Sequence, residues 1–388
     1  MKKIILISIL ILTTSCSELL NTSDPKVNSY SVKNIPTKII NANNDFSIKL
    51  FQTLNPHDGD SNIFISPVSV SFALGMTMNG ADGNTYEEMK STLGFEGLDI
   101  ETINKSYAGL INELYDASGG VAFNLANSIW YTDELSLQSE FDSLNSEYFR
   151  AKVEALDFGL KSSCKEIVNQ WVEDQTENKI KDFTRESDFE SIMLLINAIY
   201  FNASWQYQFD ESETEEKYFY PNDNESVKCE IMAQRNEYQY YAKEGIQAVE
   251  LPYANDNYSM LLIQPTNQPI DEFIAEFDRI QLAAMTKNFH KDSVNLFIPK
   301  LEIEYEKELG DILKEMGISD AFDAVQADFS KMFNELRDEI FIKLVRQKAF
   351  INLDEEGTEA AAATVVVMDW KSANGDQKNT ITLNFNKN

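Results

Sequence analysis

One run of ten residues places the strongest constraint on the fold. Residues 192–201 read IMLLINAIYF and are apolar at almost every position. A strand with one face in water alternates apolar and polar side chains, so this run favours a central strand that is covered on both faces. Asn197 lies in its middle, and a buried amide needs hydrogen-bond partners. We expect Asn197 either to make a local bulge or turn bond or to hold the sheet to a helix.

Patterns on both sides of this run indicate one mixed α+β domain. Apolar residues at helical spacing predict a helix that carries Phe46, Leu50 and Leu54 and ends at Asn55-Pro56. The sequence contains no internal repeat. Predicted helices are concentrated in its first part and predicted strands in its later part. A further helix is predicted from residue 67, and its mixture of apolar and small residues suits a buried helix that packs close to a sheet. Other helices are predicted over 167–180 and over 308–316, and further strands over 248–253, 258–263, 294–299 and 339–353.

The charge balance excludes several classes of partner. The 388 residues include 33 basic and 63 acidic side chains, which gives a net charge of −30. Such a surface repels nucleic acid, and it repels polyanionic cofactors for the same reason. Because 43% of the residues are hydrophobic, the chain can still bury a sizeable core. This composition suits an exported, soluble domain, and we expect a monomer.

The N-terminus has the pattern of a targeting segment. Two lysines precede the apolar stretch Ile4–Leu12, which is too short to span a bilayer as a mature helix. Small residues then lead to Cys16, and the pattern resembles a bacterial lipoprotein signal in which Cys16 carries the lipid. We expect a signal peptide over 1–15, a polar tether over 16–40, and a lipid anchor at the outer membrane or cell surface. The alternative is ordinary secretion after cleavage nearby.

Residue types that serve catalysis or metal binding are scarce. The two histidines, His57 and His290, lie in polar segments that predict solvated loops. No signature of an activated nucleophile, a phosphate-binding loop or a zinc site appears. Cys164 and Cys229 are too few for a disulfide framework, so we expect unpaired buried thiols, with a single bridge as the alternative. The sequence therefore predicts no enzyme, no cofactor and no metal site.

A segment near the C-terminus combines conflicting preferences. Residues 354–364 read DEEGTEAAAAT, whose alanines favour helix, whereas Val365–Val367 favour a strand. The segment could simply start a surface helix with Thr358 as its N-cap. If it is extended instead, the first residues on one face are small, while Gly357 frees the backbone. That face would carry Thr358, Ala360, Ala362, Thr364, Val366 and Met368.

Seven short motifs in order resemble those of the serpin family, over residues 41–388. The resemblance implies a fold of three β-sheets and eight or nine helices. It also implies an exposed reactive loop, at about 355–379, that can insert into the large sheet. The motifs are NIFISPVS (62–69), GADGNT (80–85), NAIYF (197–201) with Trp205, LPY (251–253), IPK (298–300), GISDAF (317–322) and QKAF (347–350).

The resemblance implies a suicide inhibitor of serine proteases. The protease attacks the loop and forms an acyl-enzyme, and insertion of the cleaved loop traps it in a covalent complex. The family's spacing from the hinge glycine places the reactive bond at Lys371-Ser372, and lysine suits a trypsin-like pocket. Matching positions give a hinge (Glu355, Gly357, Thr358, Ala360, Ala362), a shutter that controls sheet opening (Ser66, Ser69, Asn197, Gln347) and a breach where insertion begins (Trp205).

The site of cleavage has alternatives. The segment 372–385 is longer than in many serpins, so the bond could also lie near Asn374 or Lys378. Residues 366–370 offer apolar sites for elastase-like or cysteine proteases.

Two departures from the family pattern bear on function. Serpins often have histidine where this chain has Gln347, although glutamine can also donate and accept hydrogen bonds. Serpins also continue beyond the residues that match 383–387, so we expect this chain to lack the last core strands. The competing functions are a non-inhibitory binding module with the serpin fold and an inactive truncated product.

Overall fold

The computed structural model describes residues 35–386 apart from 59–60, 116–120, 223–224, 255–256, 335–339 and 359–380. The α-helices in these ranges are α1 (Thr37–Leu54), α2 (Pro67–Met78), α3 (Gly83–Thr92), α4 (Ile100–Tyr115), α5 (Ser139–Phe149), α6 (Lys161–Gln175), α7 (Ile270–Glu276), α8 (Arg279–Lys287) and α9 (Gly310–Met316). Short 3-10 helices are η2 (Asn55–His57), η3 (Glu186–Glu190), η4 (Glu211–Glu213) and η5 (Asp320–Phe322).

Strands of the described ranges form two sheets. The strands are β1 (Val121–Thr132), β2 (Lys152–Leu156), β3 (Met193–Ser204), β4 (Glu215–Asn222), β5 (Glu225–Lys243), β6 (Ile246–Pro252), β7 (Ser259–Pro265), β8 (His290–Pro299), β9 (Leu301–Glu308), β10 (Arg346–Leu353), β11 (Gly357–Thr358) and β12 (Ile381–Asn384).

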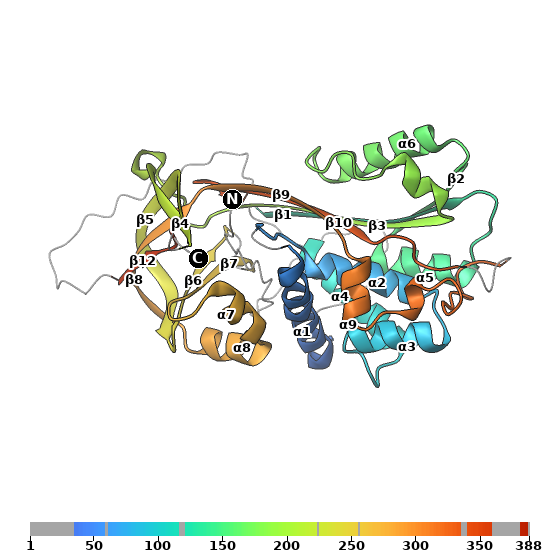
Figure 1. Ribbon diagram of the computed structural model, residues 1–388, viewed down its shortest axis with the longest axis horizontal. Helices are drawn as coiled ribbons and strands as arrows, with labels where there is room; N and C mark the ends of the chain where they lie inside the picture. The colour runs from blue at the N-terminus through green and yellow to red at the C-terminus, as the bar shows by residue number, and fades with distance from the viewer. Residues whose placement is uncertain are drawn as a thin grey trace, which may run out of the picture.

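The first sheet has the order β2-β1-β3-β11-β10-β9. β1 pairs with β2 in parallel, and the other pairings are antiparallel. Figure 1 shows α6 over one face of this sheet and α2, α4, α5 and α9 beneath the other. β3, which the sequence predicts to be a central strand, does lie inside the sheet with helices on both sides.

Side chains of β3 alternate between two apolar clusters. Ile196 and Ala198 face α6, which contributes Cys164, Val168 and Val172 at four-residue spacing. The intervening side chains pack against the main core on the opposite face and are Leu195, Ile199 and Phe201. The apolar character of both faces therefore follows from the position of the strand between two helical layers.

The second sheet has the order β12-β8-β5-β6-β7, and β4 pairs with β5. β5 is 19 residues long and pairs with β4 near its start, with β8 along its middle and with β6 at its end. The expected three sheets thus appear as two in the described residues, because β5 runs through both smaller sheets and joins them. α7 and α8 pack against this sheet through Phe273, Phe277, Leu282 and Met285.

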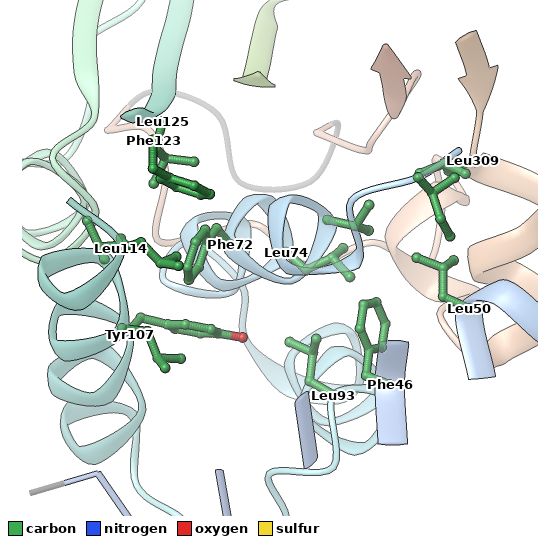
Figure 2. Packing of buried hydrophobic residues seen from close by; sticks show 14 of the residues in the cluster. Phe46, Leu50, Phe72, Leu74, Leu93, Tyr107, Leu114, Phe123, Leu125 and Leu309 are labelled. Carbon is green, nitrogen blue, oxygen red and sulfur yellow. The ribbon is translucent and has the colours of Figure 1, made fainter. Parts of the chain in front are cut away.

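The helix α2 is the buried centre of the helical layer (Figure 2). Phe72 packs edge-to-face on the ring of Tyr107 from α4, with 5.5 Å between ring centroids. The Tyr107 hydroxyl lies 2.8 Å from Ser71 Oγ. A Cβ atom built at Gly75 would lie 2.6 Å from the same ring. The small residues of α2, expected to bring the helix close to a sheet, thus also admit the aromatic ring of α4.

Two predicted boundaries were wrong. α1 begins at Thr37, so the last residues of the predicted tether are helical, and Ile39 is buried among the helices. β10 begins at Arg346 rather than at residue 339. The residues before it leave the sheet, because the Ile342 amide donates to Ala321 O near η5.

The two histidines and the two described cysteines all lie in helices or strands. His57 lies in η2, half-exposed, with its Nε2 2.9 Å from Glu315 Oε2. His290 is the first residue of β8 rather than part of a loop, because the strand starts four residues before the predicted apolar stretch 294–299. Cys164 and Cys229 are unpaired as expected, but only Cys164 is buried.

Candidate functional site

The short strand β11 separates the two central strands of the first sheet. Gly357 pairs with Ser204 of β3, and Thr358 pairs with Ala203 of β3 and with Leu353 of β10. In the described ladders β3 and β10 are therefore joined through β11 and not directly to each other. The beginning of the predicted reactive loop is thus already a strand of this sheet.

A tight turn connects β10 to β11. Asp354 Oδ1 accepts hydrogen bonds from the amides of Glu356 at 3.0 Å and Gly357 at 3.2 Å, and the Asp354 amide donates to Gly357 O at 3.0 Å. Such side-chain-to-backbone bonds are a property of aspartate that favours turns. Residues 354–357, where the hinge begins, therefore form a defined turn.

Gly357 is required for space. A Cβ atom built there would lie 2.1 Å from Ala203 O and 2.8 Å from Ser204 Cα, both backbone atoms of β3. Gly357 does not have a positive φ. The glycine expected to free the backbone serves instead to let the hinge approach β3 closely.

Glu355 anchors the turn through its largely buried carboxylate. Its Oε2 lies 2.8 Å from Lys300 Nζ, and its Oε1 accepts a 2.7 Å hydrogen bond from Thr214 Oγ1. Burial acts to raise the pKa of Glu355, but the hydrogen bonds from Lys300 and Thr214 outweigh it and lower the pKa below its ordinary value. The carboxylate in turn raises the pKa of Lys300. The pair therefore stays charged at neutral pH.

Trp205, the residue predicted for the breach, donates two hydrogen bonds to the same turn. Its Nε1 donates to Asp354 O at 3.0 Å, and its amide donates to Glu356 O at 2.9 Å. Its ring stacks on Tyr253, with 4.7 Å between centroids and 6° between the planes. The Tyr253 hydroxyl lies 2.6 Å from Thr358 Oγ1, in the buried interior.

Three of the four predicted shutter residues come together at the start of α2. Gln347 Nε2 donates to Ser66 O at 2.8 Å, and Gln347 Oε1 accepts from the Ser66 amide at 3.1 Å. Ser69 Oγ donates to Ser66 Oγ at 3.1 Å. Glutamine thus ties β10 to α2 with both its donor and its acceptor.

Asn197 stands apart from these three residues. Its Nδ2 donates to Asn127 Oδ1 at 2.5 Å, across the β1–β3 pair, and Asn127 Nδ2 donates to Phe149 O at the end of α5. The described residues show no local bulge or turn bond of Asn197, whereas they do show the expected link between the sheet and a helix. Asn197 holds the sheet to a helix only through Asn127. Its Oδ1 is buried without a hydrogen-bond partner in the described part of the chain.

A cavity of about 190 Å³ lies beyond Thr358. We call it the slot. Its walls include the start of α2, and it extends to apolar side chains of α1 and α7. The inward-facing residues of β3 and β10 that line it are Asn197, Ile199, Phe201, Gln347, Ala349 and Ile351.

Several predicted residues lie outside the described ranges. They are Cys16, Ala360, Ala362, Lys371 and Ser372. In the described ranges, no group of three or more metal-ligating side chains gathers, and no helix has the length and apolarity to cross a membrane.

Sequence reasoning missed three residues that hold the hinge and the shutter, namely Lys300, Tyr253 and Asn127. Lys300 and Tyr253 fall within short motifs of the family resemblance, which is the one signal that points to them. Asn127 lies in no such motif. Its role depends on a partner 70 residues away in sequence.

Comparison with known proteins identifies the family. A family model described as "Serpin (serine protease inhibitor)" matches residues 41–387. Serine protease inhibitor 42Dd of Drosophila melanogaster is 33% identical and covers 83% of this chain and 86% of its own. The native structure of the thermophilic serpin tengpin has a TM-score of 0.82 at 31% identity, over 91% of this chain and 89% of that one. Human thyroxine-binding globulin with bound thyroxine has a TM-score of 0.81 at 27% identity, over 90% and 92%.

The chain therefore belongs to the serpin family, and the serpin fold expected from its sequence is confirmed. The family and several of its members are described as serine protease inhibitors, whereas thyroxine-binding globulin, with the same fold, binds thyroxine.

The Glu355–Lys300 pair yields a pH-dependent prediction. Because the pKa of Glu355 is lowered in the folded protein, its stabilising effect is present above its unfolded pKa and is lost as pH falls through the folded value. We expect Glu355→Gln to lower the free energy of unfolding by about 1–3 kcal/mol at pH 7, less than for a fully buried pair, because Lys300 is partly exposed. Urea unfolding from pH 7 downward should show this difference shrinking below about pH 4.3.

A matched control is Glu101→Gln, which makes the same chemical change in an exposed pair with Lys105 on α4. Its expected effect is at most about 0.5 kcal/mol at every pH. Equal effects of the two substitutions, or an effect of Glu355→Gln that persists at low pH, would contradict the assigned role of Glu355.

Proposed function

We propose that this protein is a suicide inhibitor of serine proteases whose cleaved reactive loop inserts into the slot. The observation that carries the proposal is the position of β11, which occupies the first two places of a strand between β3 and β10. The slot continues beyond it, bounded by both strands. An added strand would pair on both of its edges at once, so insertion gains two ladders.

The register of β11 specifies where the next residues would go. Thr358 opposes Ala203 and Leu353, so each further residue moves one place back along both strands. Continued in this way, the inward side chains would meet wall residues that all line the slot. Ala360 would come between Phe201 and Ile351, Ala362 between Ile199 and Ala349, and Thr364 between Asn197 and Gln347.

This register suits the chemistry of each wall residue. Alanine is small enough to pass between apolar side chains without overpacking. Thr364 brings a hydroxyl to Asn197, whose Oδ1 is buried without a partner in the described residues. A hydroxyl that satisfies a buried acceptor removes the cost of leaving it unpaired. The sequence of the loop thus matches the polar and apolar order of the slot.

The chemistry of capture belongs to the protease. Its serine Oγ attacks the carbonyl carbon of Lys371, an ester forms, and the amine of Ser372 leaves with a proton. Insertion then draws the attached protease away from the loop's original position before water can hydrolyse the ester. A lysine at this position favours a trypsin-like target.

A non-inhibitory binding module is the second candidate, because thyroxine-binding globulin has the same fold and binds thyroxine. Small residues at Ala360 and Ala362 argue against it, since a loop that never inserts has no need of them.

Incubation with trypsin tests the inhibitory function. The mature protein, untagged at its C-terminus, is mixed briefly with trypsin, and the products are separated on a denaturing gel and weighed by mass spectrometry. We expect a boiling-stable band near the summed masses and a released peptide that begins at Ser372. Cleavage without a complex, with trypsin activity undiminished, would contradict inhibition of this protease.

Two variants separate the steps of capture. Lys371→Ala should abolish the complex with trypsin, because the side chain that enters the pocket is lost. Ala362→Glu should leave cleavage intact but prevent the complex, because a buried charge would oppose insertion. A complex formed equally well by Ala362→Glu would contradict insertion through the slot.

We also propose that the protein is exported and anchored by lipid at Cys16, on the outer membrane or cell surface. The support is the short apolar segment and the small residues before Cys16. Labelling cells with radioactive palmitate and separating their membranes should find labelled wild type in the membrane fraction and unlabelled Cys16→Ser outside it. Equal labelling and equal distribution of the two proteins would contradict the anchor.

A further inference from the structure

One buried hydrogen bond joins the loop to Tyr253, the residue that directly follows β6. The Tyr253 hydroxyl lies 2.6 Å from Thr358 Oγ1, and each residue is only 3% exposed. The Tyr253 ring is fixed on two sides, stacked on Trp205 and edge-to-face on Phe201 at 5.3 Å. The hydroxyl therefore has a defined position at the entrance of the slot.

The packing of this ring does not require the hydroxyl. A phenylalanine would stack on Trp205 equally well, whereas a buried hydroxyl destabilises the fold unless it has a partner. Burial raises the pKa of Tyr253 above its ordinary value, so the group stays neutral and can donate. Its partner among the described residues is Thr358.

We propose that the Tyr253 hydroxyl is a positioning group that holds Thr358 as the first inserted residue and fixes the register in which the loop enters the sheet. A shift of one residue would turn the Thr358 side chain to the opposite face. A shift of two would bring Glu356 or Ala360 to this point, and neither carries a hydroxyl. In each shifted register the Tyr253 hydroxyl would be buried and unpaired, so the observed register is favoured.

This role adds a positioning residue to the proposed function. Its effect on inhibition rests on that function, whereas the contact itself does not. The hold on the hinge exists before any protease arrives. It can therefore be measured on the intact protein.

Hydrogen exchange at the hinge tests the proposal. The reporters are the amides of Trp205 and Phe209, which donate to Glu356 O and Glu355 O. In the full mature chain, we expect Tyr253→Phe and Thr358→Val each to speed exchange about tenfold, which corresponds to about 1.4 kcal/mol. Because the two hydroxyls act as one pair, the double variant should exchange about as fast as either single variant and not about a hundredfold faster.

Control variants distinguish positioning from general loosening of the fold. Thr358→Ser keeps the hydroxyl and should exchange like wild type. Tyr258→Phe removes a neighbouring buried hydroxyl that donates to Leu114 O, and it should leave the reporters unchanged. Wild-type exchange in Tyr253→Phe, multiplied effects in the double variant, or equal effects of Thr358→Ser and Thr358→Val would each overturn the proposal.

The kinetic consequence has a separate readout. If insertion starts from a fixed register, Tyr253→Phe should raise the number of inhibitor molecules consumed per trapped trypsin molecule several-fold, with Thr358→Ser unchanged. If wild type forms no complex with trypsin, the inhibitory function fails while the exchange result still decides the role of Tyr253. If wild type inhibits and Tyr253→Phe consumes no more inhibitor, the effect on insertion is overturned.

Discussion

The separation of β3 from β10 is the constraint on which the rest of this structure depends. Backbone amides and carbonyls along two neighbouring strands normally satisfy one another. Here a two-residue strand lies between them at one end, and a cavity continues along their length. Under the proposed function, a chain segment that pairs with both edges would gain a large free energy, and cleavage would allow the protein to release it.

Specific polar contacts hold this arrangement in place. Glu355 and Trp205 fix the turn that leads into the sheet, and Gln347 fixes β10 to the start of α2. The side chains that line the slot are otherwise mostly apolar. The sheet is therefore secured at its entrance and at its far end, while the path between them stays open to alanines.

Much of the fold follows from the sequence by local physical rules. The two-sided apolar pattern of residues 192–201 predicts a central strand, and β3 is one. The apolar and small residues after Pro67 predict a buried helix, and α2 is one. These predictions hold because periodicity reports burial directly. The family resemblance also placed the start of the hinge at residues that form the turn after β10 and the strand β11.

Other features depend on residues that are far apart in the chain, and the sequence alone does not reveal them. The partner of Asn197 could not be predicted because Asn127 comes from a neighbouring strand. Tyr253 directly follows β6 of the second sheet but contacts Thr358 of the first. Gly357 was predicted to supply flexibility, whereas close approach to Ala203 requires it. The count of sheets differs from the expected three because β5 runs through both smaller sheets and joins them.

Thermal unfolding of the intact protein and of protein cleaved near Lys371 tests most directly whether the slot takes up the loop. Insertion would add about a dozen ladder bonds at about 1 kcal/mol each, which raises the midpoint of unfolding by about 15 °C. We expect the cleaved protein to unfold at a midpoint temperature at least that much higher than that of the intact protein. Equal midpoints, or a lower midpoint after cleavage, would show that the loop does not enter the sheet.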